Sequence, residues 1–324
     1  AFLVLAQTRS GLSCFLVPRW RPDGSKNPIQ LQQLKQKMGN AANASSETEL
    51  RGALGWMVGE EGRGVRTIIE MVATTRYDCM IGSSSGMRQA TAQAIHHASN
   101  REAFGARLSE QPLMQNLLAD LALESEAAMT YMMRVARAMD NQDNEHEKLL
   151  SRIATPVGKY WICKRTPNHA YEAMEVIGGS GVMENHIMPR LFRESPVNAI
   201  WEGSGNVQCL DILRAIEKQP EVLDAYFAEL QRAKGADKRL DQFMIKLKEE
   251  FSNSKALQYR ARTIADSMAV GLQAALLVQH ATPEMADAFC AGRLDVNGGF
   301  NYGTLPSGLN CAAIVEKASP AVEQ

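Results

Sequence analysis

A carboxylate between an indole and a glycine-rich turn is the feature of this sequence best suited to catalysis. Glu202 lies in the segment Ile200-Trp201-Glu202-Gly203-Ser204-Gly205-Asn206, directly before a predicted helix. A glutamate beside a tryptophan can lose hydration, which raises its pKa toward the range of a general base near neutral pH. The backbone amides from Gly203 to Asn206 open the helix and can receive a phosphate or a diphosphate. The alternative is that Ser204 or Asn206 caps the helix and Glu202 faces solvent.

Two other segments carry groups that bind anions or rings. The segment Arg101-Glu102-Ala103-Phe104-Gly105 follows a long predicted helix and precedes Gln111, so a guanidinium and an aromatic ring lie three residues apart. In the run that begins at Glu175, Gly178 and Gly179 allow close approach of a phosphate or of another subunit. This turn ends a helix and is therefore not a dinucleotide-binding fingerprint. The simpler alternatives are a helix end with a surface Arg and a core Phe, and a glycine helix C-cap.

These residues must be positioned mainly by helices. Apolar residues at positions 65, 68, 69 and 72 follow the helical spacing, and a second helix is predicted over 77–100. A third helix should begin near Pro112, and a fourth should cover 148–178 with kinks at Pro156 and Pro167. Further helices are expected after Asn206 and over 221–232, 242–251 and 256–291. The stretch around Pro189 and the tail from 296 onward are expected to be irregular.

The first fifty-odd residues are predicted to be rich in β structure. Apolar runs over 2–6 and 12–17 flank a turn at Gly11 and predict a hairpin, and 54–58 is another short apolar run. The first residues resemble a strand entered midway, so we expect an N-terminally incomplete chain. The predicted fold class is mostly α with a partial β domain. The predicted division is a β module over 1–64, a four-helix unit over 65–221 and an additional helical region over 222–324.

Composition limits the function classes further. The 324 residues include 35 Lys and Arg against 36 Asp and Glu, for a net charge of −1, which argues against a protein that is basic throughout. The six cysteines form no C-x-x-C pair, so neither a metal site nor a thioredoxin-like pair is expected. Scattered single thiols fit a reducing cytoplasm. No run of eighteen apolar residues occurs, so we expect no spanning helix and no membrane partner.

The motifs gain specificity in combination. The order R-x-x-F-G, Q-P, E-x-x-G-G-x-G and I-W-E-G-S-G-N between Arg101 and Asn206 resembles the acyl-CoA dehydrogenase family. The segments 37–39 and 59–64 are similar to the end of that family's middle β domain, so the resemblance covers about residues 1–218. It implies the end of a middle β-barrel domain, followed by the family's helical bundle. The family's N-terminal helical domain and first middle-domain strands are absent from this chain.

The resemblance also implies roles for individual residues. Glu202 takes the place of the catalytic base, which removes the α-proton of an acyl-CoA while a hydride leaves the β-carbon for FAD. Members of the family are usually homotetramers, dimers of dimers whose partners share FAD sites. Glu175 stands where the family has Gln and adds a negative charge near the diphosphate. The implied FAD-binding residues are Arg101, Phe104, Gln111, Gly178, Gly179, Ile200, Trp201, Gly203, Ser204, Gly205 and Asn206.

Within the family, the sequence most resembles the flavoproteins of the adaptive response to DNA alkylation. The stretches 162–165, 173–176 and 196–206 carry this resemblance, and those proteins also have an extra helical C-terminal region. It implies binding of double-stranded DNA, weak acyl-CoA dehydrogenase activity and action on an acyl-CoA or another small electrophile. The alternatives are a metabolic acyl-CoA dehydrogenase that forms a 2,3-enoyl-CoA, and a binding module that has lost its flavin.

The C-terminal region carries a basic cluster that can serve DNA binding. Between Arg232 and Arg262, nine Lys or Arg residues stand against four Asp or Glu residues. Such a cluster suits contacts with phosphates, although a solvated helix face is the equally simple alternative. Arg214, twelve residues after Glu202, either faces the mouth of an acyl pocket or is an exposed helix residue. The candidate DNA-binding residues are Arg214, Lys234, Lys238, Arg239, Lys246 and Lys248.

Overall fold

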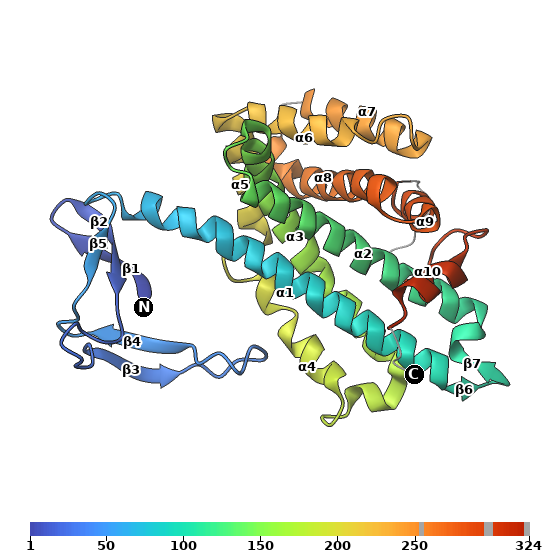
Figure 1. The fold of residues 1–324 in the computed structure, drawn as a ribbon, viewed down its shortest axis with the longest axis horizontal. Helices are drawn as coiled ribbons and strands as arrows, with labels where there is room; N and C mark the ends of the chain where they lie inside the picture. The colour runs from blue at the N-terminus through green and yellow to red at the C-terminus, as the bar shows by residue number, and fades with distance from the viewer. Residues whose placement is uncertain (253–255, 295–300, 321–324) are drawn as a thin grey trace. The chain divides into compact units, whose positions relative to one another are not determined.

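The computed structural model describes residues 1–252, 256–294 and 301–320, and divides the chain into two compact units. The first unit is Ala1–Arg76 and the second is Tyr77–Gln324. Helix α1 (Gly64–Asn100) begins in the first and ends in the second (Figure 1). The fold is mostly helical with small sheets, which confirms the predicted fold class. The three-part division at residues 64 and 221 stays a prediction.

The first unit contains two small antiparallel sheets. Strands β1 (Phe2–Thr8) and β2 (Gly11–Val17) form the predicted hairpin, and β5 (Trp56–Val58) pairs with the other edge of β2. The pair β3 (Ile29–Leu34) and β4 (Ser46–Leu50) was not predicted, because its strands alternate polar and apolar residues only weakly. Buried Asn27 joins the connecting loops, since its side-chain amide donates to the carbonyls of Pro18 and Leu54 at 2.8 Å each.

The second unit is built around two long antiparallel helices. Helix α2 (Pro112–Asp140) begins with proline in its first turn, where no amide hydrogen bond is lost. Helix α3 (Glu145–Ile177) contains Pro156 and Pro167, as predicted. It packs against α2, against α5 (Gly205–Lys218) and against α6 (Glu221–Gln231). Helix α3 is therefore the helix that α2, α5 and α6 all contact.

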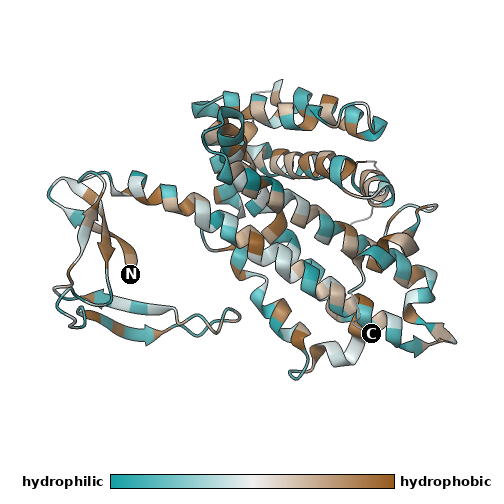
Figure 2. Cartoon of the chain, viewed as in Figure 1, coloured by the Kyte–Doolittle hydropathy of each residue, from teal (hydrophilic) through white to brown (hydrophobic). Residues whose placement is uncertain are grey.

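The remaining helices extend the same core. Helix α8 (Leu257–His280) packs on α2, α3 and α5, and α7 (Lys238–Ser252) and α9 (Pro283–Arg293) pack on α8. Figure 2 shows hydrophobic residues distributed along α8. This helix is long and apolar enough to cross a membrane, but 72% of its most apolar window is buried in the bundle. Helix α8 is therefore a core helix of the bundle.

Four local predictions are wrong, each for an identifiable reason. Helix α1 is continuous where two helices were expected, because nothing between residues 72 and 77 breaks a helix. The expected helix over 256–291 is interrupted at extended Thr282, and Pro283 begins α9. The stretch around Pro189 is helix α4 (Ile187–Glu194), whose first turn tolerates proline. The tail contains helix α10 (Cys311–Ala318), capped by Asn310, and residues 295–300 lie outside the described part.

Candidate active site

Glu202 lies in a tight elbow between a 3-10 turn (Val197–Ala199) and helix α5. Its φ is +57°, a left-handed conformation that is uncommon for a residue with a side chain, and Gly203 follows with φ +99°. A Cβ at position 203 would lie 2.8 Å from Nε2 of Gln208 and 2.9 Å from Cγ1 of Val207. Any larger residue would therefore be strained there. The Glu202 side chain is half-buried.

Two buried side chains hold the backbone of this elbow. The ammonium of Lys159, from the middle of α3, donates to the carbonyl oxygens of Trp201 at 2.8 Å and Gly203 at 2.6 Å. The side-chain amide of Gln208 donates to the carbonyl oxygens of Glu202 at 3.0 Å and Gly203 at 2.9 Å. Three consecutive carbonyl groups thus accept hydrogen bonds from side chains. Lys159 is 1% exposed and Gln208 is 0% exposed.

Residues from α1 support the other side of the elbow. The indole Nε1 of Trp201 donates to Oδ1 of Asn198 at 3.0 Å, and Nδ2 of Asn198 donates to Oγ of Ser83 at 3.2 Å. Burial raises the pKa of the Cys79 thiol, which also senses the charges of Lys159 and Glu202. Ser83 of α1 therefore supports the indole of Trp201 through Asn198.

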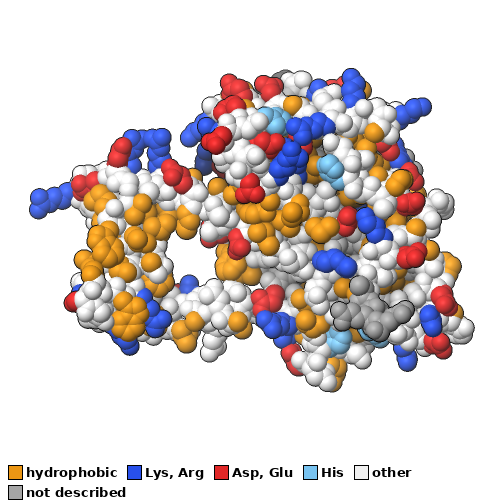
Figure 3. Space-filling view, in the orientation of Figure 1, with side chains coloured by type: hydrophobic (Ala, Val, Ile, Leu, Met, Phe, Trp, Pro, Cys, Tyr) orange, Lys and Arg blue, Asp and Glu red, His pale blue; other side chains and the backbone are white. Residues whose placement is uncertain are grey.

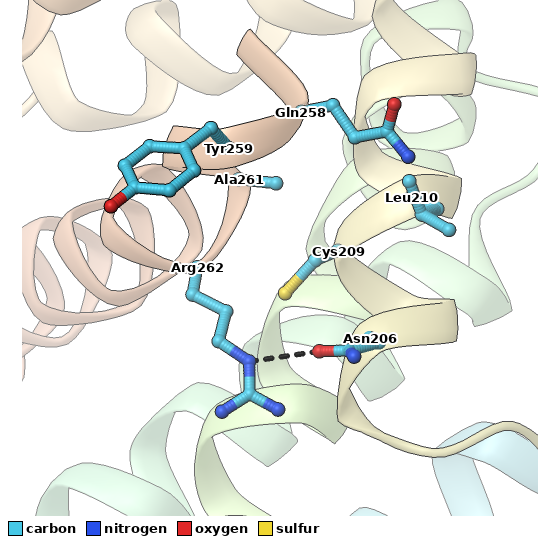
Figure 4. A pocket seen from close by; sticks show the side chains of 7 residues that line it. All are labelled: Asn206, Cys209, Leu210, Gln258, Tyr259, Ala261 and Arg262. Atoms are coloured by element: carbon cyan, nitrogen blue, oxygen red, sulfur yellow. Dashed lines mark hydrogen bonds between the residues drawn. The ribbon is translucent and has the colours of Figure 1, made fainter. Parts of the chain in front are cut away.

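The start of α5 is lined by positive charge. Asn206 Oδ1 accepts a hydrogen bond of 2.9 Å from Nε of Arg262, an exposed residue of α8. A Cβ at Gly205 would lie 3.2 Å from the Lys164 side chain, so this glycine leaves room for that lysine. Asn206, Cys209, Leu210, Gln258, Tyr259, Ala261 and Arg262 line a pocket of about 200 Å³ between α5 and α8 (Figure 4). Ser204 precedes the helix but makes no side-chain cap bond.

A second group of predicted residues lies at the far end of the bundle. Arg101 follows α1 directly, and Phe104 forms the turn between strands β6 (Glu102–Ala103) and β7 (Ala106–Arg107), where its ring is 95% exposed. Gln111 precedes α2 without making a side-chain cap bond, and its side-chain amide donates to the carbonyl oxygen of Ala103 at 2.9 Å. Phe104 and Gln111 therefore border the same small surface turn.

The glycine turn lies at this same end. Gly178 ends α3 with φ +69°, and a Cβ added at Gly178 or Gly179 would meet nothing within 4 Å. The pKa of His97 is lowered by burial and then by the charges of Arg101 and His186. Arg101 and the segment after the glycine turn therefore both lie near His97. Lys159 and Gly178 are nineteen residues apart on α3, a separation of about 28 Å at 1.5 Å per residue. The structure brings the predicted residues together in two groups, not one.

The sequence of this scaffold has clear relatives. Residues 62–217 match the sequence profile of the acyl-CoA dehydrogenase C-terminal domain. The chain belongs to the acyl-CoA dehydrogenase family. This confirms the family predicted from the four motifs. The chain is 44% identical over 299 residues to the putative acyl-CoA dehydrogenase AidB of Escherichia coli K12, an alignment that covers 92% of this chain and 55% of that protein.

Solved structures of acyl-CoA dehydrogenases have the same fold. Caenorhabditis elegans ACDH-11, in complex with C11-CoA, superposes with a TM-score of 0.80 and 29% identity over 87% of this chain and 53% of that one. A Bacillus anthracis acyl-CoA dehydrogenase complexed with FAD gives a TM-score of 0.67 at 19% identity, over 89% and 58% of the two chains, and shows the fold alone. The chain therefore spans about half the length of these acyl-CoA dehydrogenases.

The candidate DNA-binding residues of this acyl-CoA dehydrogenase family member differ in availability. Lys238, Lys246 and Lys248 project from α7, and Lys234 lies just before it; all four are exposed. Arg239 instead forms ion pairs with Asp237 at 2.6 Å and Asp287 at 2.7 Å. Arg214 is exposed on α5. Lys255, counted in the basic cluster, lies outside the described residues. Figure 3 shows Lys and Arg side chains projecting at the α7 edge.

Three site residues escaped the sequence analysis. Lys159 and Gln208 act through bonds to carbonyl groups, which no sequence motif reports. Arg262 belongs to the basic cluster, but its pairing with Asn206 depends on the packing of α8 against α5. A hint was present only for Lys159, which is a lone charge in the apolar stretch from 153 to 163. Among the described residues, no group of three His, Cys, Asp or Glu side chains could hold a metal ion.

Proposed function

We propose that the chain supplies the catalytic base and part of the flavin site of an FAD-dependent oxidoreductase of the acyl-CoA dehydrogenase type. The observation that carries this proposal is the elbow at Glu202: a left-handed glutamate, fixed on both sides and placed at the start of a helix in a family member. A carboxylate held in this way can take a proton from carbon without reorganising first.

The proposed chemistry is that of an acyl-CoA dehydrogenase. The Glu202 carboxylate takes the α-proton of a saturated acyl-CoA as the α-carbon–hydrogen bond breaks. FAD supplies the acceptor for the hydride that leaves the β-carbon. A 2,3-enoyl-CoA is the organic product, and the proton stays on Glu202 until solvent removes it. Trp201, 37% exposed, and Ile200, 66% exposed, provide apolar surface beside the base.

The described residues fit an FAD divided between two copies of the chain. The positive charges of Arg262 and Lys164 at the start of α5 suit a diphosphate held near Ser204, Gly205 and Asn206. Phe104 leaves an aromatic ring fully exposed, and Gly178 and Gly179 leave open backbone, at an end about 28 Å away along α3. A partner subunit that contributes this end would complete the site. We therefore propose a homotetramer made of two such dimers.

The test is the reduction of flavin by substrate. The full-length protein loaded with FAD is mixed anaerobically with a saturated acyl-CoA, and the loss of visible flavin absorption is followed. Glu202→Gln should slow this reduction by at least about 100-fold, since general-base catalysis contributes about that much or more. Glu217→Gln, an exposed carboxylate on α5, is the matched control and should react normally. Unchanged reduction in Glu202→Gln would refute the proposal.

We further propose that the protein binds double-stranded DNA and acts in the response to DNA alkylation, in a reducing cytoplasm. Four exposed lysines on and beside α7 favour DNA binding over the alternative of a purely metabolic dehydrogenase. The alkylation response is what the sequence resemblance over 162–165, 173–176 and 196–206 implies. All six cysteines are free thiols and five are buried, in keeping with a reducing compartment.

Salt dependence tests the DNA proposal. The affinity of the full-length protein for duplex DNA should fall steeply with salt, and replacing Lys246 and Lys248 by Gln should reduce the slope by about 2. The control replaces Lys148 and Lys317, which have ion-pair partners at 3.9 Å and 3.6 Å, and changes the net charge equally. Absence of binding at low salt, or equal loss in both double variants, would contradict this proposal and favour the metabolic alternative.

A further inference from the structure

Lys159 is a buried cation whose two identified hydrogen bonds both go to the backbone of the Glu202 elbow. It comes from the middle of α3, and it is 1% exposed. Its ammonium reaches the carbonyl oxygens of Trp201 and Gly203, which lie 42 and 44 residues further along the chain. Burying an ammonium is costly unless it is paired and hydrogen-bonded, and this one donates to two carbonyl groups. Here the bonds bracket one residue, Glu202.

The bonds define the backbone conformation of Glu202 from both sides. The carbonyl of Trp201 belongs to the peptide group that precedes the Cα of Glu202, and Lys159 holds it at 2.8 Å. The carbonyl of Glu202 belongs to the following peptide group, and Gln208 holds it at 3.0 Å. Both residues also bond to the carbonyl of Gly203, at 2.6 Å and 2.9 Å. Two fixed peptide planes fix φ and ψ of the residue between them.

This fixation is needed because the elbow adopts a conformation that the chain does not favour. Glu202 has φ +57° and lies outside any helix or strand, so no regular hydrogen-bond pattern maintains it. Without the two side chains, rotation about the peptide groups would turn the carboxylate away from its direction in the structure. A displacement of about 1 Å at a reacting group can reduce a rate by about 100-fold.

We propose that Lys159 is a positioning residue for Glu202, and that Gln208 is its counterpart on the following peptide group. Neither residue transfers a proton or contacts the substrate; each acts by fixing the direction of the carboxylate. The inference rests on the proposed role of Glu202 as the base. It adds two buried residues that support the base: Lys159 from α3 and Gln208 from α5.

The test compares Lys159→Met and Lys159→Arg with the control Lys148→Met, which lies on the same helix and is exposed. In the full-length FAD-loaded protein, Lys159→Met should lower kcat for acyl-CoA oxidation by about 30- to 100-fold while KM changes by less than about threefold. Lys159→Arg, which can still donate to both carbonyl groups, should recover at least about fivefold of the lost kcat. Lys148→Met should match the unsubstituted protein.

Hydrogen exchange gives a second readout that needs no activity. The amide exchange of the peptide over 197–208 should be faster in Lys159→Met by about tenfold or more, and unchanged in Lys148→Met. If Lys159→Met fails to fold, Gln208→Met should give the same local change. Normal exchange in this peptide, or a kcat within about threefold of the unsubstituted protein, would overturn the proposal. If the unsubstituted protein shows no flavin reduction, the proposed function fails, whereas the exchange data still decide whether Lys159 holds the elbow.

Discussion

Replacing Arg134 by methionine should destabilise the protein more than any surface substitution. Arg134 lies in α2, and its side chain is 6% exposed. Its guanidinium makes four hydrogen bonds, at 2.6 and 3.0 Å to Glu147 of α3 and at 2.6 and 3.0 Å to Glu229 of α6. These bonds tie α6 to the two central helices of the bundle.

The loss in the free energy of unfolding follows from the two carboxylates that lose Arg134 as their partner. Methionine fills most of the space, but two carboxylates with side chains 10% and 2% exposed lose their main partner. Breaking a buried ion pair in this way costs about 3–5 kcal/mol. Glu229 keeps Arg232 at 3.3 Å, so we expect the lower part of that range, about 3–4 kcal/mol. Arg137→Met, on the exposed side of the same helix, is the control and should cost less than about 0.5 kcal/mol.

The assay is urea unfolding of the unsubstituted and variant proteins at pH 7 and at low pH. Arg134 holds the pKa of Glu229 below the ordinary value of 4.5 for a glutamate, against the effect of burial, so the pair stabilises the fold above that pH and loses this contribution as pH falls. The difference between the two proteins should therefore shrink in acid. Adding Glu147→Gln and Glu229→Gln to Arg134→Met should recover part of the loss. The prediction is refuted if Arg134→Met lowers the free energy of unfolding by less than about 1 kcal/mol at pH 7. It is also refuted if the triple variant is no more stable than Arg134→Met.

Two further substitutions test other parts of the bundle. Burial lowers the pKa of His169 from 6.5 to about 4, so its contribution is complete above pH 6.5 and is lost as pH falls toward 4; His169→Gln should remove up to about 3 kcal/mol of this pH dependence in urea unfolding. An equal acid dependence in both proteins would contradict it. Gly203→Ala should cost about 1–3 kcal/mol and impair flavin reduction because of its positive φ and its contact with Gln208, whereas Gly86→Ala on α1, where a Cβ would meet only Thr166 Cγ2 at 4.0 Å, should be neutral or stabilising. Equal stability of the two alanine variants would count against the strain at position 203.

Local sequence signals predicted the elements that depend on local chemistry. The hairpin of β1 and β2 follows from apolar runs around Gly11, and α2 begins at Pro112 as expected. The break between α8 and α9 also has a local signal, Thr282-Pro283, which the apolar pattern on both sides concealed. Helix α1 shows the opposite case: the helical spacing was followed only as far as residue 72 and a second helix was expected from 77, but one continuous helix spans both, and the weak helix preference of Thr74 and Thr75 does not break it.

The candidate site could be predicted only as a set of motifs. The family resemblance placed Glu202 and the FAD-binding segments on the sequence, and those residue roles stay predictions. The support of Glu202 by Lys159 and Gln208 could not be predicted, because backbone carbonyl acceptors are present at every residue and carry no sequence signature. The pairing of Arg239 with Asp237 and Asp287 was hidden for a related reason: counting charges along the chain does not show which ones neutralise each other.

Release of the α-proton to water shows whether Glu202 is the group that removes it. A saturated acyl-CoA deuterated at the α-carbon is bound to the full-length FAD-loaded protein, and the transfer of deuterium to water is measured in single-turnover samples. The unsubstituted protein should release deuterium, and Glu202→Gln should release it at least about 100-fold more slowly. Release at the same rate in Glu202→Gln would show that another group removes the proton and would contradict the account.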